Sequence, residues 1–154
     1  MDYSNKLAVI VNASVDVLKL IREVLEQSRI KTVFFFAPEV EADSRGFVAF
    51  VNEHKPDLIL FDVPIPYEDN LRLMARVRDS LSEPQPFLIM TTSPNAVQTL
   101  IDREPALAEG VIDIVVGKPF NLDELLEAVQ RGFGKEAEEV GMSGDGRQAA
   151  GGSA

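Results

Sequence analysis

The segment at residues 57–62 constrains the fold more than any other part of the sequence. It reads Asp-Leu-Ile-Leu-Phe-Asp, and two prolines, Pro64 and Pro66, follow closely. A short apolar run that ends at prolines is typical of a buried parallel strand, which helices cover on both faces. The acid at its end, Asp62, would then lie in the crevice outside the sheet, where ligands bind in open α/β folds.

Four further apolar runs predict strands, and amphipathic helical patterns separate them. The five predicted strands cover residues 7–11, 32–36, 57–62, 87–91 and 111–116. The predicted helix starts are Ser14 as an N-cap, the apolar pattern from Phe47, Asp69 or Asn70 as a cap, Ser93 as a cap and Asn121 as a cap. A polar connection is expected over 38–45, and Pro105 should end or kink the helix that begins after Ser93. The pattern predicts an α/β fold, a five-stranded parallel sheet with helices on both faces.

The length and the C-terminal composition predict one domain and a tail. The chain has 154 residues, which suits a single hydrophobic core. From residue 135 onward the sequence is charged, then rich in glycine, with almost no large apolar side chains. Such a segment buries too little surface to offset its ordering entropy. We therefore expect a domain over 1–134 and a disordered C-terminal tail over 135–154.

Charge and composition exclude several classes of function. The chain has 15 Lys and Arg against 25 Asp and Glu, a net charge of −10, which argues against nucleic acid and anionic membranes as partners. It has no cysteine and one histidine, so thiol nucleophiles, disulfides and histidine-rich zinc sites are excluded. The N-terminus lacks a signal peptide pattern and no apolar run is long enough to span a membrane. We expect a cytoplasmic protein.

Other phosphate-binding or hydrolytic folds fit the motifs poorly. A dinucleotide or P-loop protein needs glycines after its first strand, where this chain has Asn12, Ala13 and Ser14. A phosphatase of the dehalogenase type, which also uses an aspartate nucleophile, would have a second acid two residues after that aspartate. This chain has Pro64 two residues after Asp62. No Gly-x-Ser-x-Gly elbow is present.

Over residues 6 to about 133, the chain resembles the receiver domain of bacterial response regulators, in the CheY-like superfamily. The resemblance rests on Asp62 with Pro66 four positions later, Thr91 at the end of the fourth strand, and Lys118 followed by proline after the fifth. It implies a doubly wound, flavodoxin-like sheet with strand order 2-1-3-4-5.

The resemblance also implies that the protein acts in two-component phosphorelay signalling and is not an enzyme. Asp62 would be the phosphoacceptor, Thr91 and Lys118 would contact the phosphoryl oxygens, and Mg²⁺ would lie beside Asp62. A carboxylate can attack phosphorus, and the site then only has to position the group and neutralise its charge. The implied partners are a histidine kinase or phosphotransfer protein and a downstream signalling protein. A homodimer through the fourth helix, fifth strand and fifth helix is a further expectation.

The chain departs from this family at the end of the first strand. The family usually places two acids there as Mg²⁺ ligands, whereas this chain has Asn12 and Ala13. Asn12 and the backbone carbonyl of Pro64 offer only neutral oxygens, so we expect the Mg²⁺ site, with Asp62 as its one carboxylate, to be weak or absent. Two readings stay open: a receiver phosphorylated on Asp62, and a phosphorylation-independent pseudo-receiver that acts as a protein interaction module. A purely structural interpretation of Asp62 is that it caps the strand end and pairs with Lys118.

Overall fold

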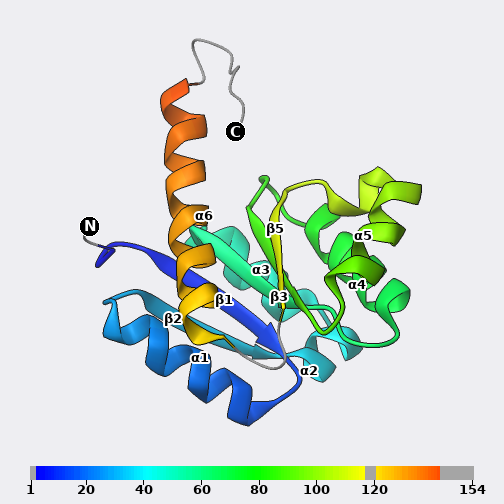
Figure 1. Cartoon of the computed structure of the whole chain (residues 1–154), viewed down its shortest axis with the longest axis horizontal. Helices are drawn as coiled ribbons and strands as arrows, with labels where there is room; N and C mark the ends of the chain where they lie inside the picture. Colours follow the sequence, from blue (N-terminus) through cyan, green and yellow to red (C-terminus); the bar gives the residue numbers. More distant parts are fainter. Residues whose placement is uncertain (1–2, 117–120, 143–154) are drawn as a thin grey trace.

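The computed structural model describes residues 3–116 and 121–142, with side chains described as far as residue 134. Five parallel strands form one sheet in the order β2-β1-β3-β4-β5 (Figure 1). Their bounds are β1 (Leu7–Asn12), β2 (Lys31–Phe36), β3 (Leu58–Asp62), β4 (Phe87–Thr91) and β5 (Val111–Val116). The predicted fold class and strand order are confirmed.

Helices cover both faces of this sheet. They are α1 (Val15–Gln27), α2 (Ala37–Ala42), α3 (Arg45–His54), α4 (Tyr67–Asp79), α5 (Pro94–Arg103), the 3-10 helix η1 (Pro105–Ala108) and α6 (Leu122–Met142). The side chains of α1 and α6 pack against one face, and those of α2 to α5 and η1 pack against the other. Among the described residues, no helix is long and apolar enough to cross a membrane.

Buried strands explain why the sheet lies at the centre. Every side chain from Ala8 to Val11 and from Leu58 to Leu60 is fully buried, as continuous apolar strands between two helical layers must be. The helix starts follow from capping. The predicted caps Ser14, Ser93 and Asn121 accept hydrogen bonds from the first turns of α1, α5 and α6.

Two predicted elements differ from the structure on the α4 side of the sheet. Part of the polar connection expected over 38–45 is the helix α2, which has Pro38 in its first turn and buries Val40. Helix α4 begins at Tyr67, so the prediction that Asp69 or Asn70 caps it is wrong. The cap is the backbone of Pro66, whose carbonyl accepts the Asn70 N–H. The side chain of Asn70 instead donates hydrogen bonds to the loop that precedes α4.

Helix α6 is described as far as Met142, beyond the predicted domain boundary at residue 134. Residues 143–154 lie outside the described residues, so the disordered tail over 135–154 stays a prediction. In Figure 1 the last turns of α6 extend beyond the sheet. The physical reason is that a helix already nucleated by packing adds Lys, Glu and Ala residues at little cost.

Candidate functional site

Three of the predicted site residues lie together at the carboxyl edge of the sheet. Asn12, Asp62 and Thr91 are the last residues of β1, β3 and β4. The registers of the parallel ladders align these strand ends side by side. Lys118 follows β5 by two positions and lies outside the described residues, so its predicted role stays a prediction.

Asp62 ends a buried strand at a half-buried position. The four residues before it in β3 are buried, while Asp62 itself keeps part of its surface in contact with solvent. The chain leaves β3 through Val63, which is also buried and whose N–H donates to the carbonyl of Met90 at 2.8 Å. This bond ties the exit of β3 to β4. The carboxylate is therefore rigidly based and still accessible.

The loop after Asp62 is fixed by Asn70, a role that the sequence did not reveal. The Asn70 side-chain amide donates to the carbonyls of Pro64 at 2.9 Å and Pro66 at 3.1 Å. Pro64 and Pro66 have no backbone N–H, so this loop has few backbone donors of its own. The Ile65–Pro66 peptide bond is cis. The only sequence signal was an amide side chain eight residues after the acid. Asn70 therefore fastens the loop to the first turn of α4.

The loop after β1 uses its polar groups internally. Asn12 is only 5% exposed, and its side-chain oxygen accepts the backbone N–H of Ser14 at 2.9 Å. The hydroxyl of Ser14 in turn caps α1 by accepting from Val17. Ala13 lies exposed between them and offers no polar side chain. This loop is an Asx turn followed by an N-cap, which stabilises the start of α1.

The described strand ends offer Mg²⁺ one carboxylate and neutral oxygens that already accept hydrogen bonds. Within the part of the chain that the structure describes, no three Asp, Glu, His or Cys side chains gather in a way that could hold a metal. The Asn12 oxygen already accepts from Ser14, and the Pro64 carbonyl already accepts from Asn70. Mg²⁺ prefers carboxylate and water oxygens in near-octahedral geometry, and Asp62 is the one carboxylate at these strand ends.

Thr91 is buried at the end of β4 and leads directly into α5. It is 1% exposed, and its hydroxyl accepts the Ser93 N–H at a long 3.4 Å. The next residue, Thr92, is exposed and shares a 2.7 Å hydrogen bond with the hydroxyl of Tyr67, the first residue of α4. Neither Tyr67 nor Thr92 was predicted to matter. A hydroxyl thus lies one strand away from Asp62, on a loop joined to α4.

Apolar side chains surround this edge. Ile65 is 73% exposed, Val15 is 53% exposed, and Val116 is also exposed. Val15 and Ile65 follow the ends of β1 and β3, and Val116 is the last residue of β5. All three therefore lie at the same edge of the sheet as Asp62. Three exposed apolar side chains therefore lie at the edge of the sheet where the Asp62 carboxylate and the Thr91 hydroxyl stand on neighbouring strands.

Comparisons with known proteins agree with this arrangement. A family model described as the response regulator receiver domain matches residues 8–130. The virulence transcriptional regulatory protein PhoP of Salmonella typhimurium is 34% identical over 88 residues, which is 57% of this chain and 37% of that protein. The transcriptional regulatory protein PhoP of Escherichia coli O157:H7 is 33% identical over the same shares. The chain thus spans well under half the length of these relatives.

Solved structures show the same fold at low sequence identity. A response regulator from Thermotoga maritima has a TM-score of 0.64 at 22% identity, and the match covers 84% of this chain and 98% of that one. NtrX from Brucella abortus has a TM-score of 0.68 at 20% identity, covering 89% of this chain and 29% of that one.

Proposed function

The chain belongs to the response regulator receiver domain family of two-component systems, and on this premise we propose that Asp62 accepts a phosphoryl group. The supporting observation is that Asp62 ends β3 at a partly buried position, with the hydroxyl of Thr91 at the end of the neighbouring strand β4. In the proposed step a carboxylate oxygen of Asp62 attacks the phosphorus of a phosphohistidine. The P–N bond breaks as the P–O bond forms, and the imidazole nitrogen keeps the electron pair.

We assign the supporting roles to Thr91 and Lys118. Phosphoryl transfer needs positioning and charge neutralisation more than covalent help. The Thr91 hydroxyl would donate to one phosphoryl oxygen, in exchange for its long contact with Ser93. The ammonium of Lys118 would neutralise another. Receiver domains are generally signalling proteins rather than enzymes, and the same is proposed for this chain.

We propose that Mg²⁺ binding is weakened in this chain. Receiver domains generally bind Mg²⁺ at the phosphorylation site. Here the end of β1 supplies a neutral amide that is already hydrogen-bonded to Ser14, and Ala13 supplies nothing. Fewer negative ligands give lower affinity for a hard cation. Phosphorylation should therefore require more Mg²⁺ than is usual for this family.

Proteins are the proposed partners. Receiver domains interact with histidine kinases and downstream effectors, and the exposed Val15, Ile65 and Val116 around Asp62 would contact a kinase or phosphotransfer protein. The net charge of −10 supports protein partners over nucleic acid for this chain. The cytoplasm, where such kinases expose their phosphohistidine, is the proposed location.

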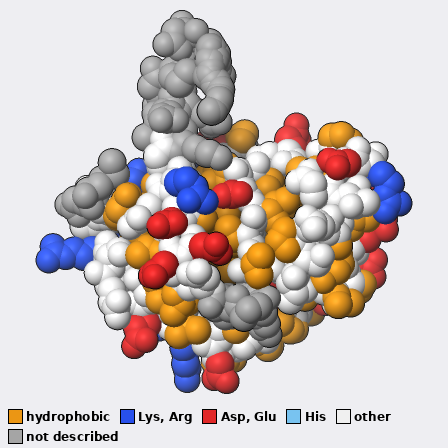
Figure 2. Space-filling model, viewed as in Figure 1, with side chains coloured by type: hydrophobic (Ala, Val, Ile, Leu, Met, Phe, Trp, Pro, Cys, Tyr) orange, Lys and Arg blue, Asp and Glu red, His pale blue; other side chains and the backbone are white. Residues whose placement is uncertain are grey.

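A second surface is suited to an output partner or a second copy. A groove of about 460 Å³ lies between α5 and β5 and is lined by residues including Ile101, Val111 and Ile114. Figure 2 shows apolar side chains gathered over β5, with acidic side chains over α6 beside them. A homodimer or a downstream protein on α5, β5 and α6 is therefore part of the proposal.

The alternative is a pseudo-receiver that signals through protein contacts alone. The observation in its favour is the end of β1, where Asn12 and Ser14 form a closed turn instead of a metal-binding pair. Such a module would keep the fold and the interaction surfaces without accepting phosphate.

Treatment with acetyl phosphate across a Mg²⁺ titration separates the two functions. Intact mass should show one added phosphoryl group in the parent chain at millimolar Mg²⁺ and none in Asp62→Asn. The matched control is Asp16→Asn, an exposed acid in the first turn of α1, which should behave like the parent. If no adduct forms on Asp62 at any metal concentration, the phosphoacceptor function is wrong and the pseudo-receiver remains.

Restoring the acids tests the diagnosis of the metal site. The double variant Asn12→Asp, Ala13→Asp should shift the Mg²⁺ dependence of phosphorylation to concentrations at least about ten-fold lower, because it adds two carboxylates beside Asp62. An unchanged Mg²⁺ dependence would show that the end of β1 does not limit the reaction.

A further inference from the structure

A pocket lies at the amino-terminal edge of the sheet, at the opposite end of the strands from Asp62. Its volume is about 390 Å³, and it is formed by the end of α4, the loop before β4 and the residues before β5. Gln85 and Gly110, which stand just before β4 and β5, both line it. Because the strands are parallel, their length separates this pocket from the carboxyl edge. The pocket is therefore distinct from the proposed phosphorylation site.

Gln85 is a buried polar residue to which the fold gives no hydrogen bond. The described chain buries three polar residues, Asn12, Thr91 and Gln85, and Gln85 is 9% exposed. Asn12 and Thr91 each accept a backbone N–H from the residue two positions further on. The Gln85 amide lines the pocket and has no hydrogen-bond partner among the described residues. Buried side-chain amides almost always have a partner, so this one has to come from inside the pocket.

Hydrogen bonds and a tight backbone approach fix the walls around Gln85. The Arg78 guanidinium donates from Nη1 to the carbonyls of Leu107 and Glu109, each at 3.0 Å. Gly110 follows with a φ of +81°, and a Cβ at that position would lie 3.4 Å from the Gln85 carbonyl. The pocket is therefore preformed, so a ligand would not have to order it on binding.

Salt bridges balance most of the charge around the pocket. Asp79 pairs with Nη2 of Arg78 at 3.1 Å, and Glu83 pairs with Nζ of Lys55 at 2.9 Å. The carboxylate of Glu109 is exposed and forms no ion pair within the part of the chain that the structure describes. The pocket thus keeps one unbalanced negative charge, which favours a cationic ligand.

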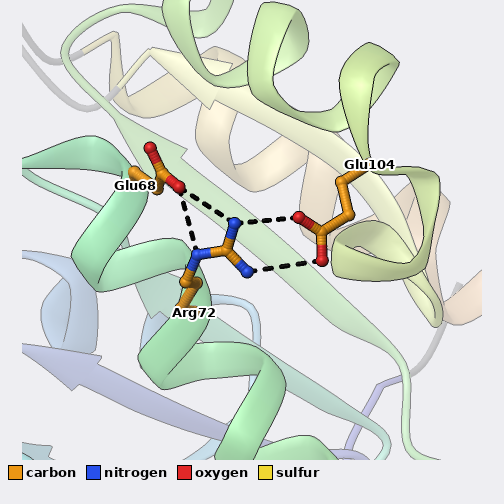
Figure 3. Close-up of polar contacts among 3 residues, drawn as sticks. All are labelled: Glu68, Arg72 and Glu104. Carbon is orange, nitrogen blue, oxygen red and sulfur yellow. Dashed lines mark hydrogen bonds and ion pairs between the residues drawn. The ribbon is translucent and has the colours of Figure 1, made fainter.

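A neighbouring depression on α4 shows a carboxylate whose charge is balanced. It is lined by residues that include Arg72 and Glu104. Arg72 donates from Nη2 to Glu104 Oε1 at 2.8 Å and from Nη1 to Glu104 Oε2 at 3.3 Å, and it also pairs with Glu68 (Figure 3). A guanidinium in two parallel hydrogen bonds is the partner that Glu104 has and that Glu109 lacks.

The polar groups of the pocket define the chemistry of its ligand. Gln85 presents a carbonyl oxygen and N–H groups side by side, which match the acceptor and donor of another amide. Glu109 can accept two parallel hydrogen bonds from a guanidinium, as in the pair of Figure 3. Leu81 and Pro84 add apolar surface on which the stem of a long basic side chain can lie. An arginine within a peptide carries all of these groups.

We propose that this pocket binds an arginine of a partner protein, with its guanidinium on Glu109 and an adjoining peptide bond on Gln85. The partner contacts the edge of the domain opposite to Asp62. The proposal therefore goes beyond the proposed function, and it holds whether or not Asp62 accepts a phosphoryl group.

NMR titration of the full chain with capped arginine tests the pocket. The probe is N-acetyl-arginine N-methylamide, and the matched probe is the citrulline compound, in which a neutral urea replaces the guanidinium. Capped arginine should shift the side-chain amide signals of Gln85 and the backbone amide signal of Gly110. Capped citrulline should bind about three-fold more weakly, because it cannot form the ion pair with Glu109. Equal binding of the two probes, or no shift at Gln85 and Gly110, would overturn the proposal.

Free arginine separates a free amino acid from an arginine within a protein. It carries a carboxylate that the unbalanced charge of Glu109 repels, and it lacks the peptide bonds that would contact Gln85. Free arginine should therefore bind more weakly than the capped form. Tighter binding of the free amino acid would overturn the assignment to a partner protein.

Two variants assign the contacts. Gln85→Met should weaken the binding of capped arginine about five-fold, the effect of one hydrogen bond, and Glu109→Gln should weaken it about three-fold, the effect of one exposed ion pair. The matched controls are Gln27→Met, exposed at the end of α1, and Glu41→Gln, exposed on α2. Both controls should bind like the parent. Parent-like binding by either pocket variant, or weaker binding by the controls, would contradict the proposal.

Urea unfolding separates a ligand-binding amide from a structural one. Because the Gln85 amide has no partner in the described chain, Gln85→Met should leave the midpoint of unfolding at the parent value or raise it. A lower midpoint would show that the amide forms a hydrogen bond within the chain, and would overturn its assignment to a ligand.

Discussion

Helices α1 and α5 begin in the same way but are held by different forces. Each starts with a serine N-cap, Ser14 or Ser93, that accepts an N–H from its first turn at 3.2 Å. Helix α1 then buries Val17, Leu18, Ile21 and Leu25 against the sheet, whereas α5 buries only Val97 and Ile101. Polar contacts from Tyr67 and Arg72 hold the ends of α5 instead. A helix held mainly by apolar burial therefore borders one side of the site, and a helix held more by polar contacts borders the other.

The difference suits a signalling domain. Apolar packing is cooperative and costly to disrupt, while single hydrogen bonds and exposed ion pairs contribute little each and exchange readily. The loop of Asn12 and Ser14 is tied to α1 and forms a stable frame. The loop of Thr91 and Thr92 leads into α5 and is held by hydrogen bonds of the Thr91 and Thr92 hydroxyls.

The largest expected effect is the loss of core packing under α1. Leu25→Ala should lower the free energy of unfolding by about 2–5 kcal/mol, because Leu25 is fully buried and its removal leaves a cavity. Leu20→Ala on the exposed face of the same helix should change it by no more than about 0.5 kcal/mol. Urea unfolding followed by circular dichroism measures both. Equal losses in the two variants would show that α1 is not held by its buried face.

The two serine N-caps make equivalent hydrogen bonds, but their removal should affect different parts of the molecule. Ser14→Ala should cost about 1 kcal/mol of the free energy of unfolding, since α1 is part of the cooperative core. Ser93→Ala should cost less in urea unfolding and act mainly on the local opening of α5, measured by amide exchange at Ala96 and Val97. If Ser93→Ala lowers the global stability as much as Ser14→Ala, then α5 is as firmly held as α1.

A smaller effect is expected from the ion pairs of Arg72 with Glu68 and Glu104. Arg72→Met should leave urea unfolding nearly unchanged, because the ion pairs are exposed, but should raise amide exchange at the end of α5 roughly two-fold. Arg22→Met on α1 is the comparison, since Arg22 pairs with Glu26 at 3.5 Å and lies 4.3 Å from the centre of the Phe34 ring, while the buried face of α1 holds that helix in place. Exchange at the last turn of α1 should stay at the parent rate. The same loosening in α1 and α5 would contradict the comparison.

The smallest expected effect is the loss of the Arg72–Glu104 ion pair in acid. The hydrogen bonds from Arg72 hold the pKa of Glu104 below its ordinary value of 4.5, so the pair stabilises the end of α5 fully above that pH. The contribution should fade as the pH falls through the lowered pKa, and exchange there should rise. NMR titration should return the pKa of Glu104 toward 4.5 in Arg72→Met. A pKa unchanged by that substitution would mean that Arg72 and Glu104 do not pair in solution.

Local chemistry made much of this protein predictable from its sequence. Apolar runs, helical periodicity and serine caps act within a few residues, so all five strands and the starts of α1, α5 and α6 were located correctly. The same reasoning placed Asp62 and Thr91 at strand ends. It failed at the start of α4, because an asparagine side chain can cap a helix or bind a nearby loop equally well, and in Asn70 it binds the loop.

Only the tertiary structure decided what surrounds the site. Tyr67 and Thr92 are 25 residues apart and Arg72 and Glu104 are 32 apart, and periodicity says which face of α4 is polar but not which residues of α5 it meets. The closed turn at Asn12 likewise depends on a side-chain orientation that composition does not fix. Such contacts depend on how two helices pack on a common sheet, and that packing is set by the whole core rather than by any one segment.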